Sequence, residues 1–291
     1  MLSLHTNAAS LSAQNSISNT QSKLSTSMTR LSTGFRINSA MDDAAGLQIA
    51  TRLKAQTSGM TVAMNNTQNS TSLLQTAEGA FAEVTNMLVR MKDLATQASD
   101  ASSTGADKTA MQAEYNALGQ ELYNVMTNTT FGGTKLLGDG AAAASGTLST
   151  SMTFQIGASS TEKMSFDVSG NLTALNAALT GLSKNFSSAA STGATELTAT
   201  ANATIGLLAT AIDSVSTVRS ALGATANRLD HVNTNLSNIA TNTKAATGRI
   251  MDTDFATESS NMTSSQMLLQ AGTAMLKQSN SMSSMVMSLL Q

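Results

Sequence analysis

The side chains that most often perform catalysis or bind metals are few in this chain, and they are scattered. The two histidines, His5 and His231, are isolated from each other in sequence, no HExxH motif is present, and none of the 291 residues is cysteine. A zinc site needs several such ligands at short spacing. The residues therefore predict no enzyme, no cofactor and no metal centre.

Asp252 and Asp254 resemble the start of a calcium-binding loop. The glycine and the final glutamate that an EF-hand loop has at its later positions are missing here. Because Asp is favoured at helix N-caps, we expect these two carboxylates to begin a helix instead.

The composition excludes further classes of protein. Charged residues make up 12% of the chain, the net charge is −2, and no basic patch stands out, which argues against a nucleic-acid partner. No segment approaches the ~18 consecutive apolar residues of a membrane span, and the N-terminus lacks the pattern of a classical signal peptide. From composition alone the chain looks cytoplasmic. It also lacks proline, so that very long helices can form without a kink.

Long helices are predicted by apolar residues that recur at alternating steps of three and four. The strongest pattern lies within 44–98, where a helix of ~55 residues would be roughly 80 Å long. A shorter helix is predicted over 108–129, and a third long helix begins near Glu196. The apolar positions of the first pattern are Leu74, Ala77, Phe81, Val84, Leu88, Met91, Ala95 and Ala98.

The middle of the chain changes to the period of a β-strand. Apolar residues alternate with polar ones on either side of GASSTE, which predicts a β-hairpin with one buried face. The glycines of FGGTKLLGDG (131–140) indicate turns. Residues 170–200 are rich in small residues and weakly patterned. The alternating residues are Leu148, Met152, Phe154 and Ile156, then Met164, Phe166 and Val168.

Both ends of the chain are predicted to be amphipathic helices with few charges. The first 22 residues contain no Asp, Glu, Lys or Arg, and Lys277 is the only charged residue after Glu258. The predicted N-terminal seam is Ile17, Gln21, Leu24, Met28, Leu31 and Phe35, and the C-terminal seam is Leu268, Ala271, Met275, Gln278, Met282, Met285 and Leu289.

These terminal helices have little apolar surface to offset the entropy lost on ordering. We expect them to be marginal or disordered in the monomer and to fold when neighbouring copies add more surface. The alternative is that the two ends pair within one chain as a further helical hairpin. The methionines of the C-terminal seam suit adaptable packing, or else an interface that tolerates slightly different contacts.

The predicted fold class is mainly α: a long antiparallel helical coiled-coil rod with a small β-hairpin region in the middle of the chain. Helices at opposite ends of the sequence then pair with each other, and both termini lie at one end of the rod.

Several segments closely resemble the signatures of bacterial flagellins. At the N-terminal end these are NTQSKLSTSMTRLS (19–32), RLSTGFRINSAMDDAAG (30–46) and GLQIATRLKAQTSGM (46–60). At the C-terminal end they are SALGATANRL (220–229), DTDFATESSNM (252–262) and QAGTAMLKQSN (270–280). The resemblance covers roughly 1–168 and 196–291, in the order that the family has.

The resemblance implies an inner coiled-coil domain, D0, formed by 1–43 and 251–291. It implies an outer domain, D1, formed by 44–168 with the hairpin and by 196–250. Residues 169–195 are a short variable region in place of the outer domains of longer flagellins, so we expect a thin, comparatively smooth filament, as for lateral flagellins. Arg36, Asn38, Asp42 and Asp43 lie in the connector between D0 and D1, where Met41 replaces the Lys of many flagellins.

The resemblance also implies a function and partners. The chain would be exported by the flagellar type III apparatus without a cleaved signal and would polymerise with copies of itself in the extracellular filament, which replaces the cytoplasmic expectation. Further partners would be the filament cap, the hook-junction proteins and an export chaperone that binds the C-terminal helix at the seam residues Leu268, Met275, Met282, Met285 and Leu289.

Arg90, Leu94 and Glu114 match the flagellin residues that are associated with recognition of the monomer by the innate immune receptor TLR5. An Arg and a Leu beside an acidic group suit an interface hot spot. Without that resemblance, Arg90 would be a solvated side chain and Leu94 would cover the edge of the core.

Two other functions stay open at this point. The hook–filament junction protein has ends that resemble those of flagellin, although QAGTAMLKQSN favours flagellin. A type III needle or translocon component is also helical and poor in proline, but RINSAMDDAAG argues against it.

Overall fold

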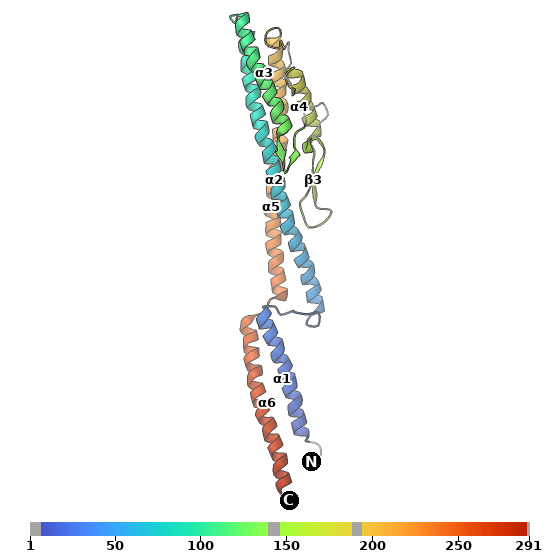
Figure 1. Cartoon of the computed structure of the whole chain (residues 1–291). Helices are drawn as coiled ribbons and strands as arrows, with labels where there is room; N and C mark the ends of the chain where they lie inside the picture. The colour runs from blue at the N-terminus through green and yellow to red at the C-terminus, as the bar shows by residue number, and fades with distance from the viewer. Residues whose placement is uncertain (1–6, 139–145, 188–193, 290–291) are drawn as a thin grey trace. The chain divides into compact units, whose positions relative to one another are not determined.

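The computed structural model describes residues 7–138, 146–187 and 194–289, with the side chains of 283–289 left out. Within these residues the protein is mainly α, as predicted (Figure 1). The helices are α1 (Ala8–Thr33), α2 (Ala44–Ser99), α3 (Gly105–Asn128), α4 (Ser169–Leu182), α5 (Ala201–Met251) and α6 (Phe255–Leu289). The strands are β1 (Thr130–Phe131), β2 (Thr134–Lys135), β3 (Met152–Gln155) and β4 (Lys163–Phe166), and a short 3-10 helix, η1, spans Thr147–Ser149.

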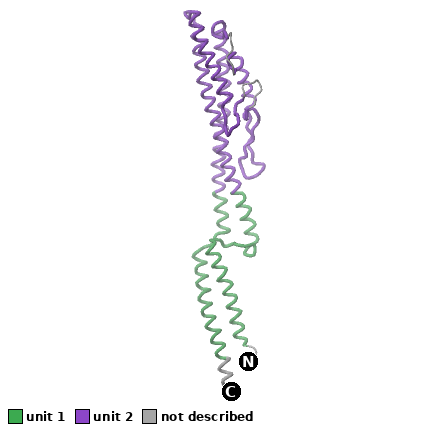
Figure 2. Tube along the Cα trace, viewed as in Figure 1, with its two compact units in different colours: residues 1–57, 241–291 green, residues 58–240 purple. Residues whose placement is uncertain are grey.

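The chain divides into two compact units, which Figure 2 distinguishes by colour. One consists of residues 1–57 and 241–291, and the other of residues 58–240. Each is described by itself.

In the unit 58–240, the parts of α2 and α5 that it contains lie side by side and antiparallel (Figure 1). All eight predicted apolar positions of α2, from Leu74 to Ala98, are fully or almost fully buried, which confirms the heptad pattern. Arg219 of α5 contacts Glu78 of α2, with 2.7 Å between Nη2 and Oε1. The α5 residues of this seam are Leu208, Ala211, Val215, Val218, Leu222 and Leu229.

By length and composition alone, α5 is long and apolar enough to cross a membrane. Its Leu208, Val215 and Leu222 are wholly buried in the core that α5 shares with α2. A helix buried in a protein core can have the same length and composition.

The start of α3 is set by a capping box. The Thr104 hydroxyl accepts a hydrogen bond from the Asp107 amide at 3.3 Å, and the Asp107 carboxylate accepts one from the Thr104 amide at 3.0 Å. This reciprocal pair satisfies amides that a helix N-terminus leaves without partners. Further along α3, the buried Tyr115 hydroxyl donates to the Leu182 carbonyl at 3.0 Å, and burial raises the pKa of that phenol.

Two antiparallel hairpins follow α3. Strands β1 and β2 are joined by Gly132 and Gly133, whose φ angles of 58° and 83° are those of a tight hairpin turn. Strands β3 and β4 form the predicted hairpin, and they bury Phe154, Met164 and Phe166 on one face. The hairpin is shorter than predicted, because Leu148 lies in η1 and Ile156 and Val168 lie beyond the strand ends.

Helix α4 lies in the segment 170–200, for which no element was predicted. Its Leu172, Leu175, Leu179 and Leu182 are buried and follow steps of three, four and three. The helical signal was therefore present, but the Ala, Ser, Thr and Gly residues around it hid it.

In the other unit, α1 and α6 pair in an antiparallel arrangement. At one end the Asn7 side chain donates to the Ser279 carbonyl at 3.3 Å, and at the other the Thr253 amide donates to the Gly34 carbonyl at 3.0 Å. The intramolecular hairpin of the two ends is thus the arrangement that the chain adopts here.

Candidate interaction surface on the terminal helices

The seam between α1 and α6 alternates large side chains with small ones. A Cβ atom at Gly272 would lie 2.9 Å from Cγ1 of Ile17, so the two backbones approach closely at this point. Within α1 only Ser27 is buried, and the large apolar residues of the seam stay partly exposed. The seam residues are Ala13, Ile17, Thr20, Leu24, Ser27 and Leu31 in α1, and Glu258, Met262, Ser265, Leu269, Gly272, Leu276 and Ser279 in α6.

This seam corrects part of the predicted one in α1. Ile17, Leu24 and Leu31 do lie on it, whereas Met28 is 54% exposed and Phe35 is 44% exposed. The small residues Ser27 and Gly34 face α6 at the neighbouring positions instead.

The correction is larger in α6. Leu268, Met275 and Met282 are 62%, 67% and 53% exposed, and Leu269 and Leu276, which face α1, each directly follow one of them. The side chains of Met285 and Leu289 lie outside the described residues. α6 therefore carries two neighbouring apolar stripes, and the prediction selected the one that is not covered within the chain. We call Leu268, Met275 and Met282 the α6 strip, and Met28 and Phe35 the α1 strip.

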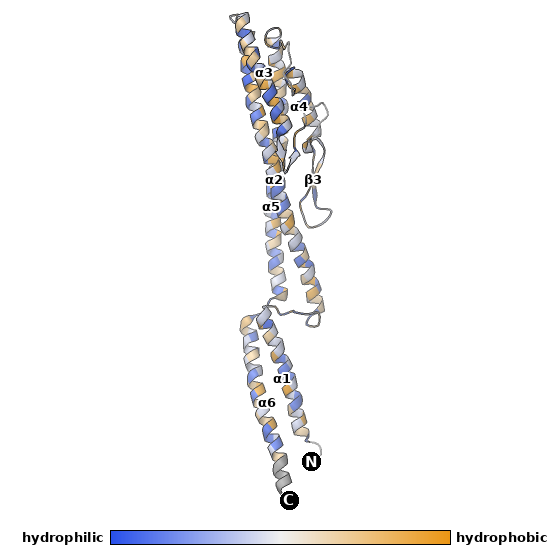
Figure 3. Ribbon diagram, viewed as in Figure 1, coloured by the Kyte–Doolittle hydropathy of each residue, from blue (hydrophilic) through white to orange (hydrophobic). Residues whose placement is uncertain are grey.

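Met28 and the α6 strip lie on opposite sides of the helix pair. In heptad terms, Met28 follows the seam residue Ser27, at an e position, whereas Phe35 lies just beyond the end of α1. The α6 strip precedes the seam residues Leu269 and Leu276, at g positions. In an antiparallel pair the e positions of both helices share one side and the g positions share the other. Figure 3 shows apolar residues distributed along both helices.

The connector joins the ends of α1 and α5 by backbone hydrogen bonds. The Arg36 amide donates to the Met251 carbonyl at 2.6 Å, and its guanidinium donates to the Ile250 carbonyl at 2.9 Å. Gly34 has a φ of 75°, which ends α1 in the left-handed conformation that glycine adopts easily. These bonds fix the point from which α1 and α6 run together.

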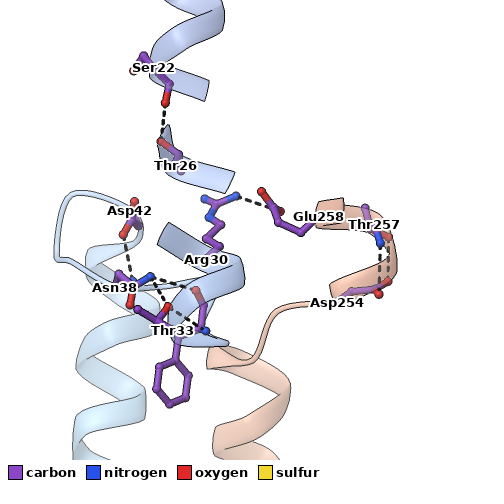
Figure 4. A network of polar contacts seen from close by, with 10 residues as sticks. Ser22, Thr26, Arg30, Thr33, Asn38, Asp42, Asp254, Thr257 and Glu258 are labelled. Carbon is purple, nitrogen blue, oxygen red and sulfur yellow. Dashed lines mark hydrogen bonds and ion pairs between the residues drawn. The ribbon is translucent and has the colours of Figure 1, made fainter. Parts of the chain in front are cut away.

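One ion pair lies between α1 and α6 close to the connector (Figure 4). Nη1 of Arg30 is 3.7 Å from Oε2 of Glu258, and the Glu258 side chain is only 10% exposed. Nε of Arg30 is buried without a hydrogen-bond partner. Because the seam holds almost no other charge, this pair favours one register of the two helices.

The other connector residues named from the sequence make local turns. Asn38 donates to the Thr33 hydroxyl at 2.9 Å, and Asp42 accepts from the amides of Asn38 and Ser39 (Figure 4). These hydrogen bonds, that from the Ser39 amide first, lower the pKa of Asp42. Asp43 caps α2 by accepting from the Gly46 amide at 2.8 Å.

Asp254 caps α6, as predicted for the Asp252–Asp254 segment. Its carboxylate accepts from the Ala256 amide at 3.0 Å and from the Thr257 hydroxyl at 2.8 Å, and the bond from Thr257 is the main cause of its lowered pKa (Figure 4). Among the described residues no three His, Asp or Glu side chains lie together as metal ligands. His231 lies on α5, and His5 is outside the described residues.

Arg90 and Glu114 form an exposed ion pair between α2 and α3, with 2.7 Å between Nη2 and Oε1. Leu94 is 2% exposed and belongs to the core. The structure therefore brings two of the three residues predicted for a receptor interface together on the surface. It corrects the expectation for Leu94, whose side chain cannot be reached from solvent while the core is intact.

Long paired helices with uncovered apolar strips define a protein that associates with other protein surfaces. Two family models match the chain: the bacterial flagellin N-terminal helical region over residues 4–143 and the bacterial flagellin C-terminal helical region over residues 205–290. The chain belongs to the bacterial flagellin family. It is a structural subunit of the flagellar filament, which is extracellular and serves motility.

Individual relatives agree with this assignment. Flagellin A of Vibrio anguillarum is 33% identical over 386 aligned positions that cover 100% of both chains, and polar flagellin C of Vibrio parahaemolyticus is 32% identical over 391 positions, again with full coverage. These alignments are longer than the 291 residues of this chain, so the relatives contain segments that it lacks. The crystal structure of Bacillus cereus flagellin is 30% identical, with a TM-score of 0.48, over 63% of this chain and 94% of that one.

Proposed function

We propose that copies of this chain pack against one another in the filament through the α6 strip and the α1 strip. The observation that supports this most directly is the exposure of Leu268, Met275 and Met282, three large apolar side chains on one side of one helix. Exposed apolar rows of this kind mark surfaces that are covered by a partner.

The placement of the two strips suits an open polymer. A surface that pairs with its own copy makes a closed dimer, whereas a head-to-tail interface joins two different surfaces and can continue indefinitely. The α1 strip and the α6 strip are different surfaces, and Met28 lies on the opposite side of the pair from the α6 strip. Each copy can thus contact one neighbour with Met28 and Phe35 and another with the α6 strip.

Seeded polymerisation of purified monomer, viewed by electron microscopy, tests this proposal. The double variant L268S/M275S should extend flagellar seeds at least about tenfold more slowly than the unchanged chain, because its strip no longer excludes water. The matched control is Gln270→Ser, an exposed polar residue on the outer face of α6 and outside both strips, which should extend seeds normally. Normal extension by the double variant would overturn the proposal. If the unchanged chain caps the seeds instead of extending them, that result would favour the hook–filament junction protein.

The same strip supports a second part of the proposal, concerning the chain before assembly. An exposed apolar row must be covered while the subunit waits for export, and an export chaperone that binds α6 at Leu268, Met275 and Met282 would do this, with Met285 and Leu289 continuing the row in sequence. The L268S/M275S variant should then bind the chaperone more weakly and be secreted less. Gln270→Ser again serves as the control.

We further propose export by the flagellar type III apparatus and contact with the filament cap and the hook-junction proteins at the ends of the filament. Residues 1–43 and 251–291 would form D0, and residues 44–168 and 196–250 would form D1. The missing segments relative to longer flagellins support a thin, smooth filament. Electron microscopy of filaments of this chain beside those of a longer relative would measure that difference in diameter.

Recognition of the monomer by TLR5 is the last part of the proposal, and it involves Arg90 and Glu114. Their exposed ion pair offers a charged surface on α2 and α3, beside Val89, which is 46% exposed. Arg90→Ala should lower receptor activation by monomer, whereas Arg52→Ala, which removes an exposed Arg elsewhere on α2, should not. Equal activation by both variants would count against this site.

A further inference from the structure

The methionines of the described residues range from fully buried to almost fully exposed. Met60, Met91, Met126 and Met164 are at most 4% exposed, whereas five others are more than half exposed. Four of these five lie on the terminal helix pair, and the fifth lies in the connector. The exposed group is Met28 (54%), Met41 (97%), Met267 (60%), Met275 (67%) and Met282 (53%).

We propose that Met267, Met275 and Met282 are a reversible oxidation site that controls whether a free subunit can assemble. The oxidant class is a peroxide. The thioether sulfur attacks one oxygen of hydrogen peroxide, the O–O bond breaks, and an S=O bond forms. The other oxygen leaves as water after proton transfer, so that sulfur loses two electrons and the peroxide gains them.

Exposure together with position on α6 selects these three residues for the reaction. Oxidation of methionine requires contact between the sulfur and the oxidant in solution, so susceptibility follows exposure. Met275 and Met282 are seven residues apart on the same side of α6, and Met267 precedes Leu268 on the adjoining face. One exposed segment of helix therefore offers three targets.

The chemical change reverses the character of the α6 strip. A sulfoxide is polar and accepts hydrogen bonds, so that methionine oxidation disrupts apolar interfaces. Burying such a group between two copies without a donor costs free energy. After oxidation, Leu268 would be the one apolar side chain left among the three residues of the strip. The effect on assembly rests on the proposed role of the strip in packing between copies.

This chemistry distinguishes the free subunit from the assembled one. In the single chain the three thioethers face solvent, whereas in the filament neighbouring copies would cover them. Oxidation should act before incorporation, and methionine sulfoxide reductases, which act on one sulfoxide epimer each, would restore the subunit. Met41, at 97% exposure and outside the strips, reports how far the oxidant has reacted.

The first measurement is oxidation of purified monomer and of filaments by hydrogen peroxide, with sulfoxide at each methionine quantified by mass spectrometry of peptides. In monomer, Met275 and Met282 should oxidise at least about tenfold faster than the buried Met91 and Met164. In filaments Met275 and Met282 should oxidise at rates close to those of the buried Met91 and Met164. Equal rates at exposed and buried methionines in monomer would overturn the proposal.

The second measurement is seeded polymerisation after oxidation. Oxidised monomer should extend seeds at least about tenfold more slowly, and treatment with both classes of reductase should restore extension. The triple variant M267L/M275L/M282L, made in a chain that also carries Met28→Leu in the α1 strip, keeps apolar side chains of similar volume. It should extend seeds normally and stay competent after peroxide. The matched control Met41→Leu should remain sensitive.

The two proposals fail in different ways. If L268S/M275S extends seeds normally without any oxidant, the packing role of the strip is wrong. If that variant fails to extend seeds while oxidised monomer of the original sequence still extends them, the packing role stands and the oxidation site is wrong. Loss of assembly by the triple leucine variant after peroxide would likewise overturn the oxidation site.

Discussion

At the scale of single residues, carboxylates near the ends of helices accept hydrogen bonds that fix the local backbone. Asp107 and Asp254 each accept hydrogen bonds from a nearby Thr hydroxyl, and Asp42 accepts from amides in the connector turn. In each case the bonds favour the ionised form and lower the pKa of the carboxyl. In a chain with 12% charged residues, these few ionised groups set where helices start.

Asp254→Asn should remove a pH-dependent part of the stability of the terminal pair. The pKa of Asp254 is below its ordinary value of 3.8 in the folded chain, so the ionised carboxylate stabilises the fold above that pH. This contribution is lost as the pH falls through the folded pKa. Urea unfolding followed by circular dichroism should show the unchanged chain more stable than the variant at about pH 6, with the difference closing below 3.8. A difference that is the same at every pH would contradict this explanation.

The Arg30–Glu258 pair should have a small but measurable coupling energy. The distance is 3.7 Å and the Arg30 side chain is 30% exposed, so solvent screens the attraction. We expect a coupling of about 1 kcal/mol from a cycle of Arg30→Ala, Glu258→Ala and the double variant. The comparison pair is Arg90–Glu114, more exposed at 51% and 45%, which should couple more weakly in the same measurement. A stronger coupling at Arg90–Glu114 would show that exposure does not decide the order.

At the scale of elements, the sequence predicted those helices whose large apolar residues are also the buried ones. In α2, Leu74, Phe81 and Leu88 are both the most apolar and the best buried residues of their turns. In α6 two apolar stripes lie side by side, because Leu269 and Leu276 face α1 while Leu268 and Met275, one position before them, do not. Periodicity predicts either stripe as the seam, and only the partner helix decides which one is buried.

The site residues named from the sequence also differ in how far adjacent residues alone determine them. The caps at Asp43 and Asp254 could be predicted because an N-cap depends on a few adjacent residues. The burial of Leu94 could not, because it lies outside the α2 seam, and the core that it joins includes residues of α4, which was not predicted. Arg90 and Glu114 are 24 residues apart and come together only once α3 packs on α2.

Gly272→Val should prevent α1 and α6 from pairing in the observed register. Even a single Cβ at this position would lie 2.9 Å from Ile17, and the branched side chain would push the helices apart. Such overpacking costs about 1–3 kcal/mol, which a pair with few buried apolar residues cannot easily absorb. The variant should lose helical signal from the terminal segments and fail to polymerise. The control is Gly223→Ala in α5, where a Cβ meets nothing within 4 Å and should be tolerated or stabilising. Equal effects of the two changes would refute the close approach.

The turn of the β3–β4 hairpin should depend on Gly59 of α2. A Cβ at Gly59 would be 2.8 Å from the Cβ of Ala158, so the turn rests directly on the helix. Gly59→Val should lower the free energy of unfolding by about 1–3 kcal/mol, measured by thermal denaturation of the monomer. The added change Ala158→Gly opens space and should recover part of that loss. No recovery in the double variant would place the damage elsewhere than at this contact.

At the scale of the whole molecule, stability is distributed unevenly between the two units. The unit 58–240 buries large side chains such as Phe81, Tyr115 and Leu222 almost completely. The α1–α6 pair buries no large apolar side chain of α1 to that degree. Regions with few buried apolar contacts open at a lower free energy than the core does. The terminal helices can therefore pair within one chain and still open easily. The surface that neighbouring copies add in the filament would stabilise the paired state.

Limited digestion with trypsin measures this difference, and it is the prediction on which the assembly argument depends. In dilute monomer, cleavage after Lys23 and Lys277 should be rapid, because α1 and α6 open readily and trypsin cuts opened chain. Arg219 has its own contact with Glu78 in the core seam, so cleavage there should be at least about tenfold slower and serves as the internal control. In filaments Lys23 and Lys277 should become as resistant as Arg219, since each α6 strip would be covered by a neighbouring copy. Resistant termini in dilute monomer would mean that the seam is sufficient by itself, and that assembly adds contacts to helices that are already stable.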